Sequence, residues 1–192
     1  VHIFGTVQRY DRRFFVKSLV PECRRLHWAR LQLEKEFKLL LSLNLPGVVR
    51  AYELTEIPGA GLSIVMEYVS GMTFDRWLAT RPSRKVRRAA AMSLLAAVEG
   101  LHAAGVVHRD LKPGNIMVDP VSGNVTVIDL GMGDSDAFAL LKLPAGTRAY
   151  AAPEQMAEGY RARPSCDVYA LGALLRRLDC GICWNVASRR AL

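Results

Sequence analysis

The most informative part of this 192-residue sequence is the stretch His108-Arg109-Asp110-Leu111-Lys112-Pro113-Gly114-Asn115. It gathers a histidine, a carboxylate, two cations and an amide in one short segment. The proline and glycine within it indicate a loop rather than a helix or strand. An isolated His-x-Asp pattern would be interpreted as a buried pair that only fastens such a loop to the core.

Regular segments are predicted on both sides of this stretch. Residues 84–104 carry apolar residues at helical spacing, which predicts a long helix that ends at Gly105. Residues 115–119 and 125–129 are short apolar runs around turn residues, which predicts a hairpin. We expect one further helix over about residues 167–178.

The N-terminal third is predicted to be mostly β-structure with one helix. Residues 1–20 alternate apolar and polar and predict a hairpin with Lys17 on its second strand. A helix is expected from Arg24 to Leu43, because apolar residues recur there at helical spacing before a proline and glycine. Residues 48–54 and 62–68 predict two more strands.

Residues 108–115 resemble the catalytic loop of eukaryotic-like (Hanks-type) serine/threonine protein kinases, H-R-D-L-x-x-x-N. The resemblance implies that Asp110 accepts the proton of the substrate hydroxyl and that Asn115 binds magnesium. Lys112 would place its charge beside the transferred phosphoryl group. Eight consecutive matching positions make a purely structural role for the loop the weaker interpretation.

Three later segments are similar to further elements of the same family. Residues 128–131 resemble its D-F-G element with leucine for phenylalanine, which implies that Asp129 binds magnesium. Residues 146–154 are similar to the end of a kinase activation segment, in which Thr147 would hydrogen-bond the catalytic Asp and Lys. Residues 167–172 match the next helix of the family, whose aspartate supports the catalytic loop.

The resemblance also assigns residues that would bind ATP. Lys17 would contact the α- and β-phosphates and pair with a glutamate of the following helix. Glu36 lies ten residues before Pro46, where the family keeps that glutamate, and is preferred over Glu34. Residues 63–71 are similar to the hinge between the lobes of a kinase, with Met66 as gatekeeper. The resemblance therefore implies these adenine contacts: Glu67, Val69 and Met117.

The sequence departs from the family pattern in several places. The glycine-rich phosphate loop is absent as a whole, and few residues follow the predicted 167–178 helix, so we expect a catalytic domain truncated at both ends. Phe15 stands where a small alanine usually covers the adenine. Only Ser135 precedes Thr147 as an obvious phosphorylation site, and Arg189 or Arg190 would have to serve as the partner of Glu154.

Composition limits the possible function classes. Hydrophobic residues make up 51% of the chain and charged residues 23%, which is typical of a folded globular protein. We expect no membrane span and no secretion signal. Four scattered cysteines favour a reducing compartment, and hence the cytoplasm. The net charge of +8 would allow nucleic-acid binding, but its densest run, residues 81–88, is interpreted as a solvated helix face, so such binding is not expected.

The sequence thus predicts an α+β, two-lobed protein-kinase-like fold. Its first lobe, residues 1–68, is a small antiparallel sheet with one helix, and residues 69–192 form a larger, mainly helical lobe. The implied function is transfer of the γ-phosphate of Mg-ATP to a hydroxyl of a protein or peptide. The alternatives are a pseudokinase that binds nucleotide or acts as a scaffold, and a small-molecule kinase, which the Ala152-Pro153-Glu154 element disfavours.

Overall fold

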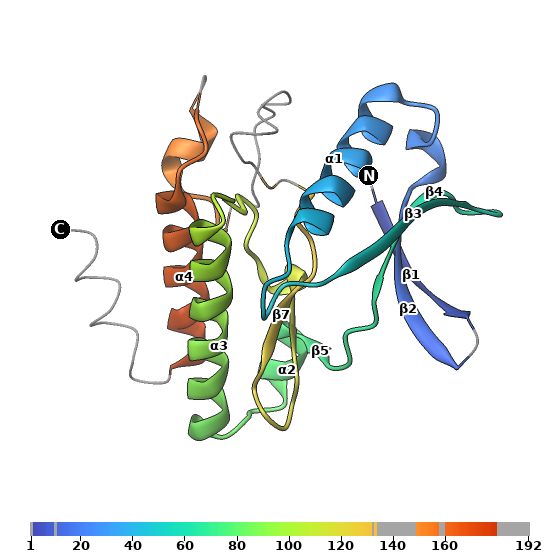
Figure 1. Ribbon diagram of the computed structural model, residues 1–192. Coiled ribbons are helices and arrows are strands. Elements are labelled where there is room, and N and C mark those ends of the chain that lie inside the picture. The colour runs from blue at the N-terminus through green and yellow to red at the C-terminus, as the bar shows by residue number, and fades with distance from the viewer. Residues whose placement is uncertain (1, 10, 132, 134–148, 158–159, 180–192) are drawn as a thin grey trace. The chain divides into compact units, whose positions relative to one another are not determined.

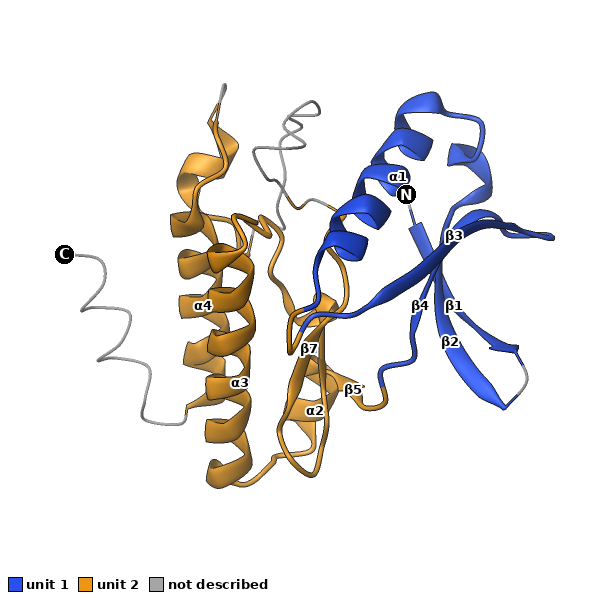
Figure 2. Cartoon of the chain, viewed as in Figure 1, with its two compact units in different colours: residues 1–44, 48–69 blue, residues 45–47, 70–192 orange. Residues whose placement is uncertain are grey.

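The computed structural model describes residues 2–9, 11–131, 133, 149–157 and 160–179. The chain divides into two compact units, coloured blue and orange in Figure 2. Unit 1 holds residues 1–44 and 48–69, and unit 2 holds residues 45–47 and 70–192. The predicted first lobe instead ended at residue 68 and contained residues 45–47. Those residues contact unit 2, since the carbonyl of Gly47 accepts a hydrogen bond from the amide of Val127 at 2.8 Å.

Unit 1 is built on a four-stranded antiparallel sheet (Figure 1). Its strand order is β1-β2-β4-β3. The strands are β1 (His2–Arg9), β2 (Arg12–Leu19), β3 (Ala51–Ile57) and β4 (Gly61–Glu67). The predicted hairpin of residues 1–20 is therefore present. The strand predicted over 48–54 begins three residues later, because Val48 and Val49 are buried directly after the Pro46-Gly47 turn, outside the sheet.

Helix α1 (His27–Ser42) follows β2 in unit 1. Its buried residues include Ala29, Leu33, Glu36 and Leu40, which share one face at helical spacing. The prediction placed the start of this helix at Arg24. The structure instead has a short 3₁₀ helix, η1 (Pro21–Cys23), whose i to i+3 bonding delays the α-helix.

Unit 2 contains the long helices α3 (Arg84–Ala103) and α4 (Pro164–Leu178), which lie side by side in Figure 1. Proline at the first position of α4 is compatible with a helix start, so α4 begins before the predicted residue 167. A three-stranded sheet has the order β5-β6-β7. Its strands are β5 (Met72–Thr73), β6 (Ile116–Val118) and β7 (Val125–Val127).

The remaining described elements of unit 2 are short. They are α2 (Phe74–Ala79), η2 (Pro113–Asn115) and η4 (Pro153–Met156). The sequence did not predict β5 or α2, since elements of two and six residues are too short to show a period. Phe74 and Trp77 of α2 are nevertheless fully buried.

Helix α3 ends as its sequence predicts. The amide of Gly105 donates to the carbonyl of His102 at 3.0 Å, and the amide of Val106 donates to that of Leu101 at 2.9 Å. With a φ of +73° at Gly105, these bonds form a Schellman motif. The cap turns the chain from α3 directly into the loop that begins at Val106. None of the helices within the described residues is long and apolar enough to cross a membrane.

Candidate active site

The loop of residues 108–115 is held from α4 by the side chain of Asp167. Its two oxygens accept hydrogen bonds from the amides of His108 and Arg109, each at 2.8 Å. His102 Nε2 of α3 lies 2.8 Å from Asp167 Oδ2. Arg109 has a φ of +70°, a conformation that costs energy for any residue with a side chain. The buried carboxylate thus stabilises a strained turn.

The side chain of His108, the first residue of this loop, is completely buried. Burial lowers its pKa below the ordinary value of 6.5, and this outweighs the opposing effect of the nearby Asp167, Asp129 and Asp110 carboxylates. His108 Nδ1 accepts a hydrogen bond from the amide of Asp110 at 3.3 Å. The imidazole is therefore neutral and helps to set the backbone at Asp110.

Three predicted site residues of the loop meet at one carboxylate. Lys112 Nζ donates to Asp110 Oδ2 at 2.6 Å. Asn115 Nδ2 donates to the carbonyl of Asp110 at 2.9 Å and to its Oδ2 at 3.3 Å. Only 12% of the Asp110 side chain and 32% of the Lys112 side chain are exposed. The cluster combines a proton acceptor with a cation that can offset negative charge.

The segment that carries Asp129 is attached to the same loop. The amide of Ile128 donates to the carbonyl of Asn115 at 3.0 Å, and the amide of Gly131 donates to Asp129 Oδ1 at 2.8 Å. Leu130 is buried, so this leucine anchors the segment in the core. Met117 is buried in β6, opposite Thr126 of β7.

The predicted partners Lys17 and Glu36 form a closed ion pair within unit 1. Lys17 Nζ donates to both carboxylate oxygens of Glu36, at 2.7 and 2.6 Å. The side chains are 0% and 1% exposed. Lys17 Nζ also lies 5.7 Å from the centre of the Phe4 ring. The structure thus pairs Lys17 with Glu36, the glutamate preferred over Glu34.

The remaining predicted residues are distributed as follows. Glu67 ends β4 in unit 1, where its amide donates to the carbonyl of Arg50 at 2.9 Å, and Val69 is the last residue of that unit. The amide of Glu67 is therefore already engaged by the backbone of the same unit. Thr147, Ser135, Arg189 and Arg190 lie outside the described residues.

Sequence reasoning missed Gln155, which fixes the chain after Ala152 to the loop. Its Nε2 donates to the carbonyl of Arg109 at 2.8 Å, and its Oε1 accepts from the amide of Ala152 at 2.9 Å. The local signal was incomplete: Gln155 lies three residues after the N-cap residue Ala152, as in a capping box, but alanine lacks the side-chain oxygen that this motif requires. His102 was also missed, and its sequence neighbours offer no such signal.

A second tether lies at the other end of α4. Arg177 donates to the hydroxyl of Tyr150 at 2.9 Å and pairs with Asp75 of α2 at 2.6 Å. The guanidinium also lies 5.7 Å from the centre of the Phe74 ring. Arg177 therefore joins α2, α4 and the residue two positions before Ala152.

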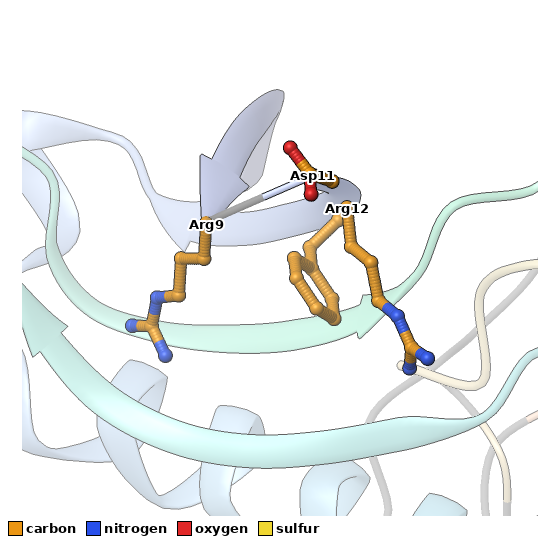
Figure 3. A pocket seen from close by; sticks show the side chains of 4 residues that line it. Arg9, Asp11 and Arg12 are labelled. Carbon is orange, nitrogen blue, oxygen red and sulfur yellow. The ribbon is translucent and has the colours of Figure 1, made fainter.

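A separate hollow of about 420 Å³ lies at the tip of the β1–β2 hairpin and is lined by Arg9, Asp11, Arg12 and Phe14 (Figure 3). None of the predicted site residues lines it. Within the described part of the chain, no group of three His, Cys, Asp or Glu side chains is arranged to hold a metal ion. The predicted magnesium ligands, Asn115 and Asp129, would combine an amide with one carboxylate, so this absence does not bear on them.

Comparison with known proteins shows that residues 3–185 match the family described as protein kinase domain. The chain is similar to a Streptomyces coelicolor protein named probable serine/threonine-protein kinase, with 35% identity over 88% of this chain and 26% of that protein. It is 35% identical to serine/threonine-protein kinase PknA of Mycobacterium tuberculosis, over 86% of this chain and 40% of that protein. It is 34% identical to CBL-interacting serine/threonine-protein kinase 24 of Arabidopsis thaliana, over 75% of this chain and 33% of that protein. The chain thus spans well under half the length of each of these relatives.

Proposed function

The chain belongs to the protein kinase domain family, and we propose that it transfers the γ-phosphate of ATP to a serine or threonine hydroxyl of a protein. The observation that carries this proposal is the cluster of Asp110, Lys112 and Asn115. The buried Lys17–Glu36 pair also supports the proposal, because it fixes the position of a lysine amine that could bind a phosphate group.

We assign Asp110 as the group that accepts the hydroxyl proton. As the hydroxyl oxygen bonds to the γ-phosphorus, the bond to the β–γ bridging oxygen breaks and ADP leaves with that oxygen. The proton passes to the Asp110 carboxylate, which lies beside the Lys112 ammonium. Lys112 and Lys17 offset the negative charge of the phosphates, and Thr147 is assigned to hydrogen-bond Asp110 and Lys112.

Asn115 and Asp129 fit magnesium in their chemistry, because Mg²⁺ prefers oxygen ligands. Asn115 Nδ2 is turned toward Asp110, which directs its Oδ1 away from that carboxylate. When bound, magnesium would neutralise phosphate charge. The backbone at Glu67 and Val69, together with Met117, is assigned to the adenine.

The direct test is Asp110→Asn in the full chain. We expect this substitution to lower the rate of phosphotransfer to a protein substrate by about 10²- to 10⁴-fold, because asparagine cannot accept the proton. Thermal stabilisation by Mg-ATP should persist. Asp11→Asn, at the exposed hairpin turn, makes the same chemical change outside the cluster and should leave the rate unchanged. Undiminished transfer by Asp110→Asn would remove Asp110 as the required base.

A pseudokinase remains the second candidate because of Phe15, which stacks on Tyr68. Binding of Mg-ATP without radiolabel transfer to any protein would favour this candidate. A small-molecule kinase would instead phosphorylate metabolites and no protein. We also infer a reducing, cytoplasmic location, which agrees with the free thiols of Cys23 and Cys166.

A further inference from the structure

One face of β2 carries Lys17, Phe15 and Arg13, because alternate residues of a strand point to the same side. Phe15 pairs in register with Met66 of β4, and Lys17 pairs with Ile64. Phe14, between Arg13 and Phe15 in sequence, points to the opposite face, where its ring meets that of Tyr52 edge-on at 5.8 Å. Adjacent phenylalanines of one strand thus serve two different faces of the sheet.

The Phe15 ring is engaged in an aromatic stack. It lies parallel to the Tyr68 ring, with centroids 5.4 Å apart and an interplanar angle of 15°. The guanidinium carbon of Arg13 is 5.8 Å from the centre of the same tyrosine ring. Tyr68 follows directly after β4 and remains 40% exposed. The stack is therefore an accessible aromatic surface beside the end of β4.

The position of the stack matters for the nucleotide proposed above. Phe15 is two residues from Lys17, which corresponds to about 7 Å along an extended strand. That distance is comparable to the separation of a base from its first phosphate by one ribose. The proposed adenine contacts, Glu67 and Val69, flank Tyr68 in sequence, so the base would extend from Lys17 toward Phe15 and not away from it.

We propose that Phe15 is a specificity-determining residue that restricts the binding of the purine base on this face of unit 1. This inference rests on the proposed function. The Phe15 ring, held against Tyr68, occupies space that a base bound beside Glu67 and Val69 requires. ATP therefore binds only when the ring leaves its stacked position, and the lost stacking weakens the affinity.

The test measures the dissociation constant of Mg-ATP by titration calorimetry on the full chain. Phe15→Ala is expected to bind ATP about two- to tenfold more tightly than wild type, which is the factor that one aromatic stack represents. Phe14→Ala is the matched control, because it removes a neighbouring ring from the opposite face, and it should leave the dissociation constant unchanged.

Phe15→Leu provides a second variant in case alanine prevents folding, since leucine keeps an apolar side chain without a ring. It should also tighten ATP binding. If both Phe15 variants bind ATP no more tightly than wild type while Lys17→Met abolishes binding, the proposed function stands and this inference is wrong. Equal tightening by Phe14→Ala would also overturn it, because the effect would then be a general loosening of the sheet. If Lys17→Met binds ATP as wild type does, the proposed nucleotide site and this inference both fail.

Discussion

At the scale of single residues, substituting one member of the Lys17–Glu36 pair is expected to be costly. Both groups are removed from water, so each depends on the other to offset its desolvation. Removing one charge takes away the attraction that offsets the desolvation of the other group. A pair of this kind fixes a side-chain position more than it adds to net stability, which suits a lysine that must meet a phosphate.

We predict that Glu36→Gln lowers the free energy of unfolding by about 3 kcal/mol, because it removes the carboxylate charge that faces the buried Lys17 ammonium. Glu34→Gln makes the same change two residues away and should alter stability by less than about 0.5 kcal/mol. Urea denaturation of both variants measures the difference. Equal effects would show that the ion pair has no special role.

His108 predicts how stability depends on pH. Its pKa is lower in the folded chain than its ordinary value of 6.5, so the unfolded chain takes up this proton first as the pH falls. The stability that neutral His108 contributes is complete above pH 6.5 and is lost progressively below it. As the pH falls, the free energy of unfolding of His108→Leu should therefore decrease less steeply than that of wild type. The two slopes should differ by up to about 1.4 kcal/mol per pH unit, the value for one proton.

This measurement uses urea denaturation between pH 7.5 and 5.5 without nucleotide or metal. His27→Leu, at the exposed start of α1, controls for the loss of a histidine. Parallel pH profiles for wild type and His108→Leu would contradict the prediction.

At the scale of elements, the turn between β6 and β7 is packed tightly against the first turns of α3. Gly123 has a φ of +79°, and a Cβ placed there would lie 2.6 Å from the carbonyl oxygen of Val86 and 3.2 Å from the Cβ of Ala89. Relieving this contact would require the backbone of α3 or of the turn to shift, which costs free energy. Glycine at this position therefore sets how closely hairpin and helix approach.

Gly123→Ala should lower the free energy of unfolding by roughly 3 kcal/mol, because it adds a backbone clash to a left-handed conformation. Gly105→Ala has a similar φ of +73° with nothing within 4 Å of the added Cβ. It should cost only about 1 kcal/mol, the strain of the conformation alone. Thermal denaturation of the two variants separates the contact from the strain, and equal losses would rule out the contact.

The long elements could be predicted from sequence and the short ones could not. Helix α3 follows its apolar period and its glycine cap from Arg84 to Ala103. The start of α1 was wrong by three residues, because Pro21 begins a 3₁₀ helix that periodicity does not detect. Among the site residues, the choice of Glu36 followed from its distance to Pro46. The bond from Gln155 to Arg109 and the stack of Phe15 on Tyr68 depend on tertiary contacts that no local pattern encodes.

At the scale of the whole molecule, the predicted α+β protein kinase fold is confirmed by the family match over residues 3–185. The division into two units means that each has buried residues of its own. Leu33 and Ile64 are fully buried in unit 1, as are Leu94 and Leu101 in unit 2. A substitution that destabilises the core of one unit should therefore increase local unfolding in that unit more than in the other.

We predict that Glu36→Gln accelerates amide hydrogen exchange at Val16 and Ile64 by about a hundredfold, the factor that corresponds to 3 kcal/mol. The amides of Leu94 and Leu101 in α3 should exchange at wild-type rates. Mass spectrometry or NMR of the exchanging chain resolves the two groups. Equal acceleration in both would show that the units unfold as one.

The carboxylate of Asp167 has a practical consequence for dissecting this protein. It stabilises the turn at Arg109, which lies 58 positions earlier in the chain, so the local sequence alone does not determine the conformation of this turn. A peptide copied from residues 108–115 would not reproduce the arrangement of Asp110, Lys112 and Asn115. The shortest fragment able to do so must reach beyond residue 167, and grafting the loop into another scaffold requires that an acceptor for its two amides be transplanted with it.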